Sequence, residues 1–278
     1  MRALAGFGII LLSIAVGLPA QSKQSKSAPV VTPKQTVPKA PAPPPAAEHK
    51  PEPLGPMIGP PSTEKLTYGV EWRLVRAGTV VVETKKNWGR LKLESAGLVS
   101  KLFKIDDVYA INYDDPYCAT VAVLDAIEGK RHRETRIQYD RVQNHAYYTE
   151  RDVPTNAIVR NADVAVPPCV HDVVGAFLTL RGMTLDASRS LELPVSDGRR
   201  FAQVKMEPQE HEEVKTPAGS FKTLRFEAGL LNGAVYTRRG RVFLWLTDDP
   251  RHLPVQIQVR MGFPVGTVTL GLEKEEHQ

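Results

Sequence analysis

Two cysteines, Cys118 and Cys169, are the most reactive side chains of this 278-residue chain. They could form a disulfide or bind a metal. In an oxidising compartment, an even pair of cysteines forms a disulfide by default. Cys118 and Cys169 could instead be free thiols, or could join His171 as soft metal ligands, but the Cys-Val-His spacing is a weak zinc signal. We therefore predict a Cys118–Cys169 disulfide and no metal site.

Catalytic motifs that can be recognised from spacing are absent from the sequence. It contains no GxSxG, HExxH, Walker loop or GxGxxG. Adjacent carboxylates occur at three places: Asp106-Asp107, Asp114-Asp115 and Asp248-Asp249. On a strand, neighbouring side chains face opposite sides, so such a pair does not readily share a proton. We predict no catalytic residue and no cofactor, and expect that the protein is not an enzyme.

Charged side chains leave two interpretations open. The acidic run from Glu210 to Glu213 is typical of a solvated segment before a strand. Several arginines lie on strand-like runs: Arg90, Arg131, Arg133, Arg136, Arg238, Arg239 and Arg241. They either surround a lipid or glycan headgroup or belong to an ordinary exposed strand face, and the second interpretation is simpler.

Large apolar side chains are the other candidates for a binding site. We expect a pocket, if one exists, to be lined by Trp72, Val174, Phe177, Leu178 and Trp245. A sheet that curls over a helix encloses a volume that side chains either fill or leave open. The same residues could therefore form an ordinary filled core.

The elements that must position these residues are mostly strands. The run LTYGVEWRLV, residues 66–75, alternates Leu66, Tyr68, Val70, Trp72 and Leu74 with polar residues or glycine, as a half-buried strand does. Ala77-Gly78 interrupts it before the run at 79–88, which indicates a hairpin. Further strand-like runs cover 119–127, 135–140, 145–150, 191–195, 201–206, 222–230, 241–246, 255–259 and 267–272. The pattern predicts a mainly β (α+β) fold with a curved antiparallel sheet or half-barrel.

One segment has helical spacing instead. HDVVGAFLTLRGM, residues 171–183, predicts a principal helix, with Asp172 near its start and Arg181 near its end. We expect its apolar face to pack on the concave side of the sheet. A second, shorter helical turn is predicted at GLVSKLFKI, residues 97–105.

The N-terminal segment predicts export. Arg2, an uncharged apolar stretch and a small residue at Ala20 form the pattern of a secretory signal, and an uncleaved anchor is the alternative. Residues 21–62 are rich in proline and lysine and have no aromatic residue, which is typical of a disordered linker. We therefore predict a signal peptide at 1–20, a linker at 21–62 and one domain at 63–278.

Charge argues against nucleic acid as a partner. Lys and Arg number 36 against 31 Asp and Glu, a net charge of +5. Residues 1–62 hold 6 basic and 2 acidic residues, which leaves 30 basic and 29 acidic residues for the rest, a net charge of +1. The basic character therefore belongs to the N-terminal segment and not to the domain.

Four blocks of the domain resemble the DUF3108 family of exported bacterial proteins of unknown function. They are LTYGVEWRLVRAGTVVVE, PPCVHDVVGAFLTLR, TPAGSFKTLRFE and LWLTDDPRHLPVQIQV, in that order. The resemblance covers most of residues 64–273 and implies no activity. The general arrangement is remotely similar to the lipoprotein carriers LolA, LolB and RseB, in which a curved sheet holds helices and acyl chains on its concave side; this likeness is analogy.

Three functional hypotheses follow. The first is a non-catalytic envelope or periplasmic module that binds an apolar or acylated ligand, a lipoprotein or a polypeptide on the concave face. The second is a structural or assembly factor that contacts other envelope proteins, and the third is a hydrolase. In each case we expect the mature protein to be peripheral to the membrane at most.

Overall fold

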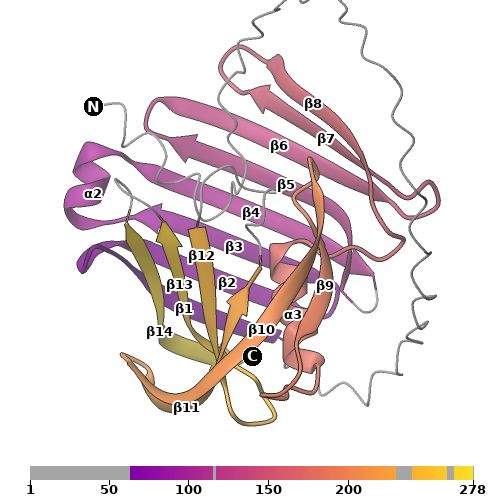
Figure 1. The fold of residues 1–278 in the computed structure, drawn as a ribbon. Coiled ribbons are helices and arrows are strands. Elements are labelled where there is room, and N and C mark those ends of the chain that lie inside the picture. The colour runs from indigo at the N-terminus through magenta and orange to yellow at the C-terminus, as the bar shows by residue number, and fades with distance from the viewer. Residues whose placement is uncertain (1–62, 115–116, 230–239, 262–265, 278) are drawn as a thin grey trace, which may run out of the picture.

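The structure, a computed structural model, describes residues 63–114, 117–229, 240–261 and 266–277, and most of them lie in strands (Figure 1). The predicted signal peptide at 1–20 and linker at 21–62 lie outside the described residues, as do Asp115, Arg238 and Arg239.

The described residues form one sheet of fourteen strands. The N-terminal eight are β1 (Thr63–Trp72), β2 (Val75–Lys85), β3 (Trp88–Ser95), β4 (Ile105–Asp114), β5 (Cys118–Glu128), β6 (Arg131–Asp140), β7 (His145–Asp152) and β8 (Ala157–Ala165). The C-terminal six are β9 (Leu191–Ser196), β10 (Phe201–Thr216), β11 (Gly219–Ala228), β12 (Gly240–Thr247), β13 (Pro254–Met261) and β14 (Thr267–His277).

The order of the strands in the sheet follows the chain except at one position. It runs β8-β7-β6-β5-β4-β3-β2-β1-β14-β13-β12-β11-β10-β9, so β1 pairs with β14 in the middle of the sheet. All named strands that pair do so antiparallel, with Val70 opposite Leu270 across this central seam. Two meanders, one from each half of the chain, are thereby joined into one open sheet.

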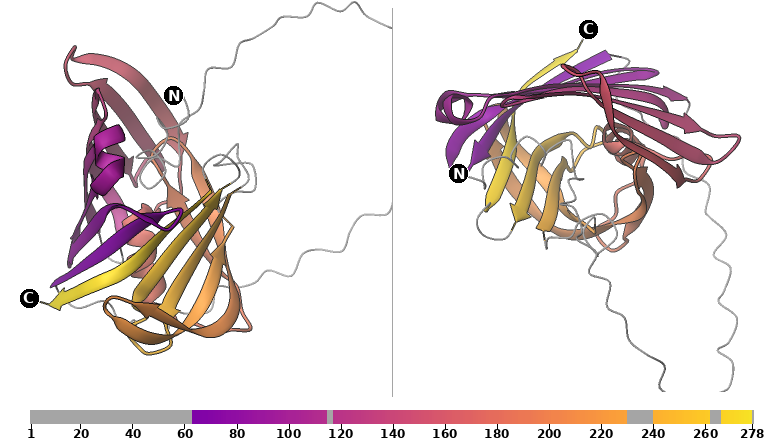
Figure 2. Two further views of the ribbon diagram at one scale, coloured as in Figure 1. Left: turned by 90° about the vertical axis from the view of Figure 1, so that its left-hand side faces the viewer. Right: turned by 90° about the horizontal axis from the view of Figure 1, so that it is seen from above.

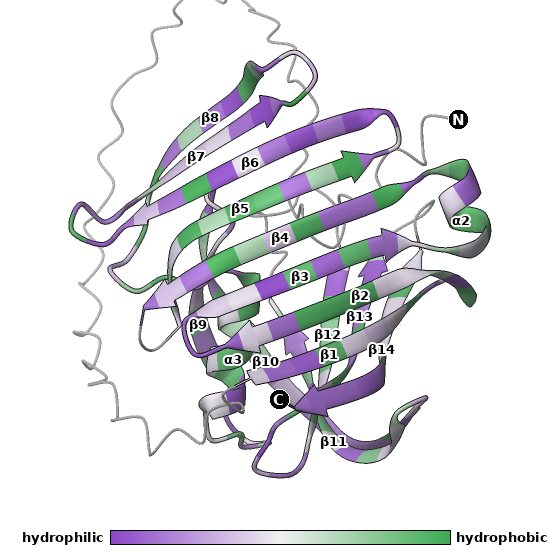
Figure 3. Cartoon of the chain, turned by 180° about the vertical axis from the view of Figure 1, so that it is seen from behind, coloured by the Kyte–Doolittle hydropathy of each residue, from purple (hydrophilic) through white to green (hydrophobic). Residues whose placement is uncertain are grey.

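Alternation of side chains explains why these segments are strands. In β4, Ile105, Asp107, Tyr109, Ile111 and Tyr113 are buried while the residues between them are half-buried or exposed. Apolar and polar bands alternate along several strands (Figure 3). Successive side chains on a strand face opposite sides, so one face of the sheet collects the apolar residues.

The C-terminal strands curl round the helix α3 (Val173–Gly182), which lies in the connection between β8 and β9 (Figure 2). Asp172 begins α3: its carboxylate accepts hydrogen bonds from the backbone amides of Val174 (3.2 Å) and Gly175 (2.8 Å). Such an N-cap satisfies amides that have no partner within the helix. The Cys118–Cys169 disulfide, with Cα atoms 4.9 Å apart, fastens the start of β5 to the chain just before α3.

The predicted mainly β fold is confirmed, and α3 coincides with the helix predicted at 171–183. It is accompanied by a second helix, α2 (Gly97–Leu102), so the single-helix description holds only in part. Neither helix among the described residues is long and apolar enough to cross a membrane.

One strand boundary was predicted wrongly. The first hairpin turns at Arg73–Leu74 and not at Ala77-Gly78, which lie inside β2. Leu74 is therefore 93% exposed instead of facing the core. Pattern alone places the end of an alternating run poorly, because Leu74 fits the alternation whether or not the strand continues.

Candidate ligand-binding site

An apolar cavity of about 150 Å³ lies between α3 and the concave side of the sheet. From α3 it is lined by Val173, Val174, Phe177, Leu178 and Arg181. The N-terminal strands contribute Glu64, Leu66, Tyr68, Val80, Val82, Thr84 and Leu91, and the C-terminal strands contribute Gly240, Val242, Pro254, Ile257, Val259, Met261 and Leu270. The wall thus spans the central seam and unites both halves of the chain.

Strand register brings the lining residues together. Leu66 lies opposite Val82, which lies opposite Leu91, and Tyr68 lies opposite Val80. On the other side of the seam, Ile257 pairs with both Leu270 and Leu244. Residues paired in this way share a face of the sheet, so the row of aliphatic side chains is continuous across the strands.

The cavity runs along the strands between two unlike ends. Gly240 and Met261 are paired at one end, and Pro254, Glu64 and Thr84 lie at the other. Seven residue steps separate Met261 from Pro254, or roughly 23 Å of strand. Among the described lining residues, none at the Gly240–Met261 end is charged, whereas the Glu64 end carries Glu64 and Arg181.

A buried ion pair forms the polar end. Arg181 donates from both terminal nitrogens to the two carboxylate oxygens of Glu64, at 2.5 and 2.9 Å, and the side chains are only 3% and 1% exposed. The Nε of Arg181 donates to the carbonyl of Arg251. Bidentate pairing of this kind neutralises both charges in a place with little access to water.

Two hydroxyl groups lie beside this pair. The Tyr68 hydroxyl donates to the carbonyl of Pro254 at 2.7 Å, and burial raises the pKa of Tyr68 well above its usual range. Thr84 lies directly opposite Glu64, and its Oγ1 has no hydrogen-bond partner within the described part of the chain. The polar end therefore offers neutral hydrogen-bonding groups but no net charge.

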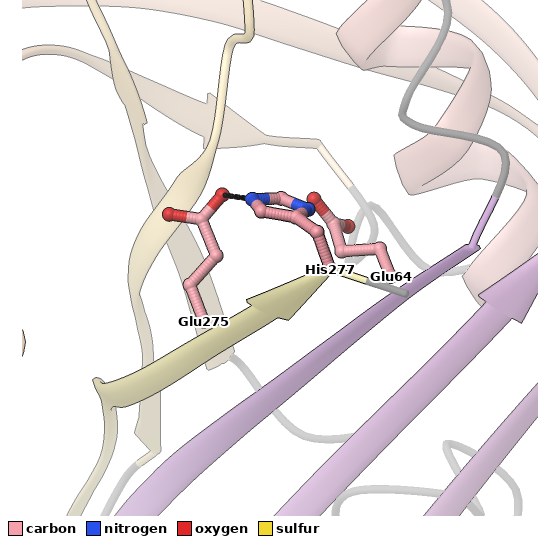
Figure 4. Close-up of side chains that lie close together, drawn as sticks. All are labelled: Glu64, Glu275 and His277. Carbon is pink, nitrogen blue, oxygen red and sulfur yellow. Dashed lines mark ion pairs between the residues drawn. The ribbon is translucent and has the colours of Figure 1, made fainter.

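Glu64 also belongs to a cluster with Glu275 and His277 whose donor atoms lie within 4.8 Å of one another (Figure 4). A carboxylate–histidine set is a common ligand set for divalent cations. Here Glu64 is already paired with Arg181, and Arg251 lies 3.1 Å from Glu275. Because both carboxylates are neutralised by arginines, we assign no metal to this cluster.

Three of the five residues predicted to line a pocket, Val174, Phe177 and Leu178, line the cavity. Trp72 is opposite Val268 at the Gly240–Met261 end and is not among the lining residues. Trp245 is also separate from the cavity: its indole nitrogen donates to Glu212 at 2.7 Å, and its ring packs beside Phe243. A ligand-binding role for all five stays a prediction.

The aliphatic residues of β2 and β13 were missed. Val80, Val82, Ile257 and Val259 belong to runs that were correctly predicted as strands. Their alternation could have shown which residues share a face, but not that the two faces meet across β1 and β14.

Of the adjacent carboxylates singled out in the sequence, Asp249 lies in a turn and Asp107 is buried away from the cavity. Asp249 accepts from Thr247 and from the backbone of Arg251, as a turn residue does. Asp107 is buried on β4, away from the cavity wall, and burial together with the nearby Glu128 raises its pKa to about 8. Burial likewise raises the pKa of Glu128 to about 7. Neither carboxylate contributes to the cavity.

Comparisons with known proteins agree with this architecture. The model of DUF3108, described as a protein of unknown function, matches residues 67–273. A beta-barrel-like protein of the domain of unknown function DUF1849 from Brucella abortus matches with a TM-score of 0.53 and 9% identity, over 80% of this chain and 100% of that chain.

A "putative lipoprotein" from Parabacteroides distasonis matches with a TM-score of 0.32 and 10% identity, over 80% of this chain and 99% of that chain. No curated protein matches. The comparisons therefore support a family and a fold, and the function has to be inferred from the site.

Proposed function

The chain belongs to the DUF3108 family, whose function is unknown, and we propose that it binds a molecule with an acyl or similar apolar chain between α3 and the sheet. The observation that carries the proposal is the apolar cavity itself, which aliphatic and aromatic side chains line over most of its length. The protein is then a binding module and not a catalyst.

An unfilled apolar cavity lowers the stability of the folded protein unless a ligand fills it. Protein interiors are packed about as densely as organic crystals, and each missing contact loses dispersion energy. Apolar cavities near this size exclude water and accept apolar guests. A ligand chain that fills the space would recover contacts that the protein does not make by itself.

The surroundings of α3 suit a preformed site. Asp172 caps its start, the disulfide holds the preceding chain, and the Glu64–Arg181 pair fixes its end. A site that is already ordered loses little entropy when a ligand enters. The disulfide also supports export to an oxidising compartment, where we place the protein in the periplasm or cell envelope.

A structural or assembly role is the second candidate, because β8 forms one edge of the sheet that the described residues build. Ile158 and Val159 on this strand are 57% and 45% exposed. An uncovered edge strand can pair with another chain. This role would leave the cavity without a ligand.

Filling the cavity tests the first proposal. Val82 lines the cavity, whereas the neighbouring Val81 faces the other side of β2. We expect Val82→Phe to weaken binding of the fluorescent fatty acid cis-parinaric acid by at least tenfold, measured by titration of delipidated protein. Val81→Phe should bind as the wild type does.

Native mass spectrometry of gently purified protein provides an independent readout, in which an added lipid mass is expected for the wild type and Val81→Phe. Wild-type protein that neither retains a lipid nor binds the probe would refute the proposal. Equal binding by both variants, with unchanged melting temperatures, would also contradict it.

A further inference from the structure

We infer that the end of the domain formed by the β1–β2 turn and α2 docks onto the surface of an anionic lipid bilayer. Four large aliphatic side chains are presented to solvent there: Leu74 (93% exposed), Val75 (50%), Leu98 (68%) and Leu102 (72%). We call these four residues the aliphatic tip. Clustered exposed apolar side chains mark interaction sites more often than scattered ones do.

The turn and α2 lie side by side. The backbone amide of Ala96, just before α2, donates to the carbonyl of Ala77 at 2.8 Å, and Gly78 pairs with Ser95. Val99 is the buried residue of α2, while Leu98 and Leu102 are one helical turn apart on its exposed side. Figure 3 shows both apolar segments at the same end of the sheet.

The β1–β2 turn keeps a leucine where the backbone disfavours it. Arg73 and Leu74 have φ angles of +50° and +66°. Two-residue hairpin turns with positive φ at both positions normally use Asn-Gly, because a Cβ atom is strained there. A strained and almost fully exposed leucine serves neither the turn nor the core, and strain of this kind tends to persist at functional positions.

Charge at the tip complements an anionic surface. Residues 71–76 and 96–104 together contain the basic residues Arg73, Arg76, Lys101 and Lys104, and the acidic residue Glu71, so 4 − 1 gives a net charge of +3. All four basic residues are exposed, but Arg76 is paired with Glu273 of β14, on the far side of β1, so the net charge is +2 once this carboxylate is counted. Basic residues beside inserted aliphatic side chains are the usual combination in proteins that lie on membranes.

The tip borders one end of the cavity. The backbone of Arg73 donates to Thr267 at 3.3 Å, and Met261, at the end of β13, donates to Gly266. Met261 and Gly240 lie at the end of the cavity where none of the described lining residues is charged. A docked bilayer would therefore lie near the apolar end of the cavity. The closeness of the bilayer to the cavity has a role only if the proposed lipid binding is correct. Docking to the bilayer does not depend on that proposal.

Co-flotation of the full chain with vesicles tests the inference. We expect binding to vesicles of phosphatidylglycerol and phosphatidylcholine (1:1), and much weaker binding to phosphatidylcholine alone. Leu74→Ser combined with Leu98→Ser and Leu102→Ser should reduce the partition coefficient at least tenfold. The matched control is Val142→Ser in the β6–β7 turn, since Val142 is also 93% exposed but lies at the opposite end of the strands.

A single substitution separates docking from folding. Leu74→Gly removes the strain at positive φ, so it should raise the melting temperature while it weakens vesicle binding. The inference is overturned if wild-type protein ignores anionic vesicles, as a protein-docking tip would, or if the triple variant binds them as the wild type does. Lost vesicle binding with intact cis-parinaric acid binding would leave the proposed function standing.

Discussion

Asp107 shows how strongly the pKa of one carboxyl group depends on its surroundings. It is 1% exposed, and its Oδ1 has no partner within the described part of the chain, whereas the adjacent Asp106 is half-buried on the other side of β4. Desolvation disfavours its charged form, which explains why its pKa rises to about 8. Burial therefore keeps the Asp107 carboxyl largely protonated near neutral pH, which its place in the sequence beside another aspartate does not indicate.

Stability should consequently fall as the pH rises. Asp107 and Glu128 titrate near 8 and 7 in the folded chain, above their ordinary values of 3.8 and 4.5. Their contribution is fully present below those ordinary values and is lost as the pH passes through 7 and 8. We expect a loss of roughly 3–4 kcal/mol in the free energy of unfolding between pH 6 and pH 8, measured by urea unfolding.

Asp107→Asn should remove most of this pH dependence, while Asp106→Asn should change it less, because burial and Glu128 raise the pKa of Asp107 more than Asp106 does. A wild-type stability that is constant or increases over the same pH range would contradict the assignment.

At the scale of elements, α3 is the helix that the site depends on. Its sequence contains its own start signal, because Asp172 precedes the first turn and accepts from two backbone amides. We expect Asp172→Ala to lower the free energy of unfolding by about 2 kcal/mol, since the cap is lost in a buried place. Asp172→Asn retains an acceptor and should lose less; chemical unfolding of both variants checks this, and equal losses would show that the cap is not the cause.

Strands and helices could be predicted where a short stretch of sequence has a clear alternating or helical pattern. The alternation in 66–72 and the spacing in 171–183 identify β1 and α3, and the second helical turn at 97–105 contains α2. No strand run was predicted over β4 or β8, nor over β3 beyond Trp88. The outer strand β8 is largely exposed and has the mixed sequence AIVRNADVA, so it lacks the apolar alternation that burial imposes.

The cavity could not be predicted from such local patterns. Its walls come from strands that are far apart in the sequence, such as β2 and β13, and their faces meet only after β1 has paired with β14. The disulfide could be predicted for a different reason. The sequence predicts export to an oxidising compartment and contains an even number of cysteines, and together these indicate a disulfide.

At the scale of the whole molecule, the Glu64–Arg181 pair connects residues 117 positions apart, on β1 and α3. Removing one partner leaves the other charge buried without compensation. We expect Glu64→Gln or Arg181→Met alone to cost about 3–5 kcal/mol, and the double variant to cost clearly less than the sum. A double-mutant cycle by urea unfolding measures this coupling, and additive losses would contradict it.

The pairing of β1 with β14 has a consequence for how the chain reaches its native state. Neighbouring strands elsewhere in the described sheet also follow each other in the chain, so each such hairpin closes a short loop. The ladder that sets Glu64 opposite His277 instead joins segments near both ends of the domain. Loop closure over such a distance is entropically expensive and slow. We therefore expect the meanders to form early and the cavity to appear only in the last step of folding.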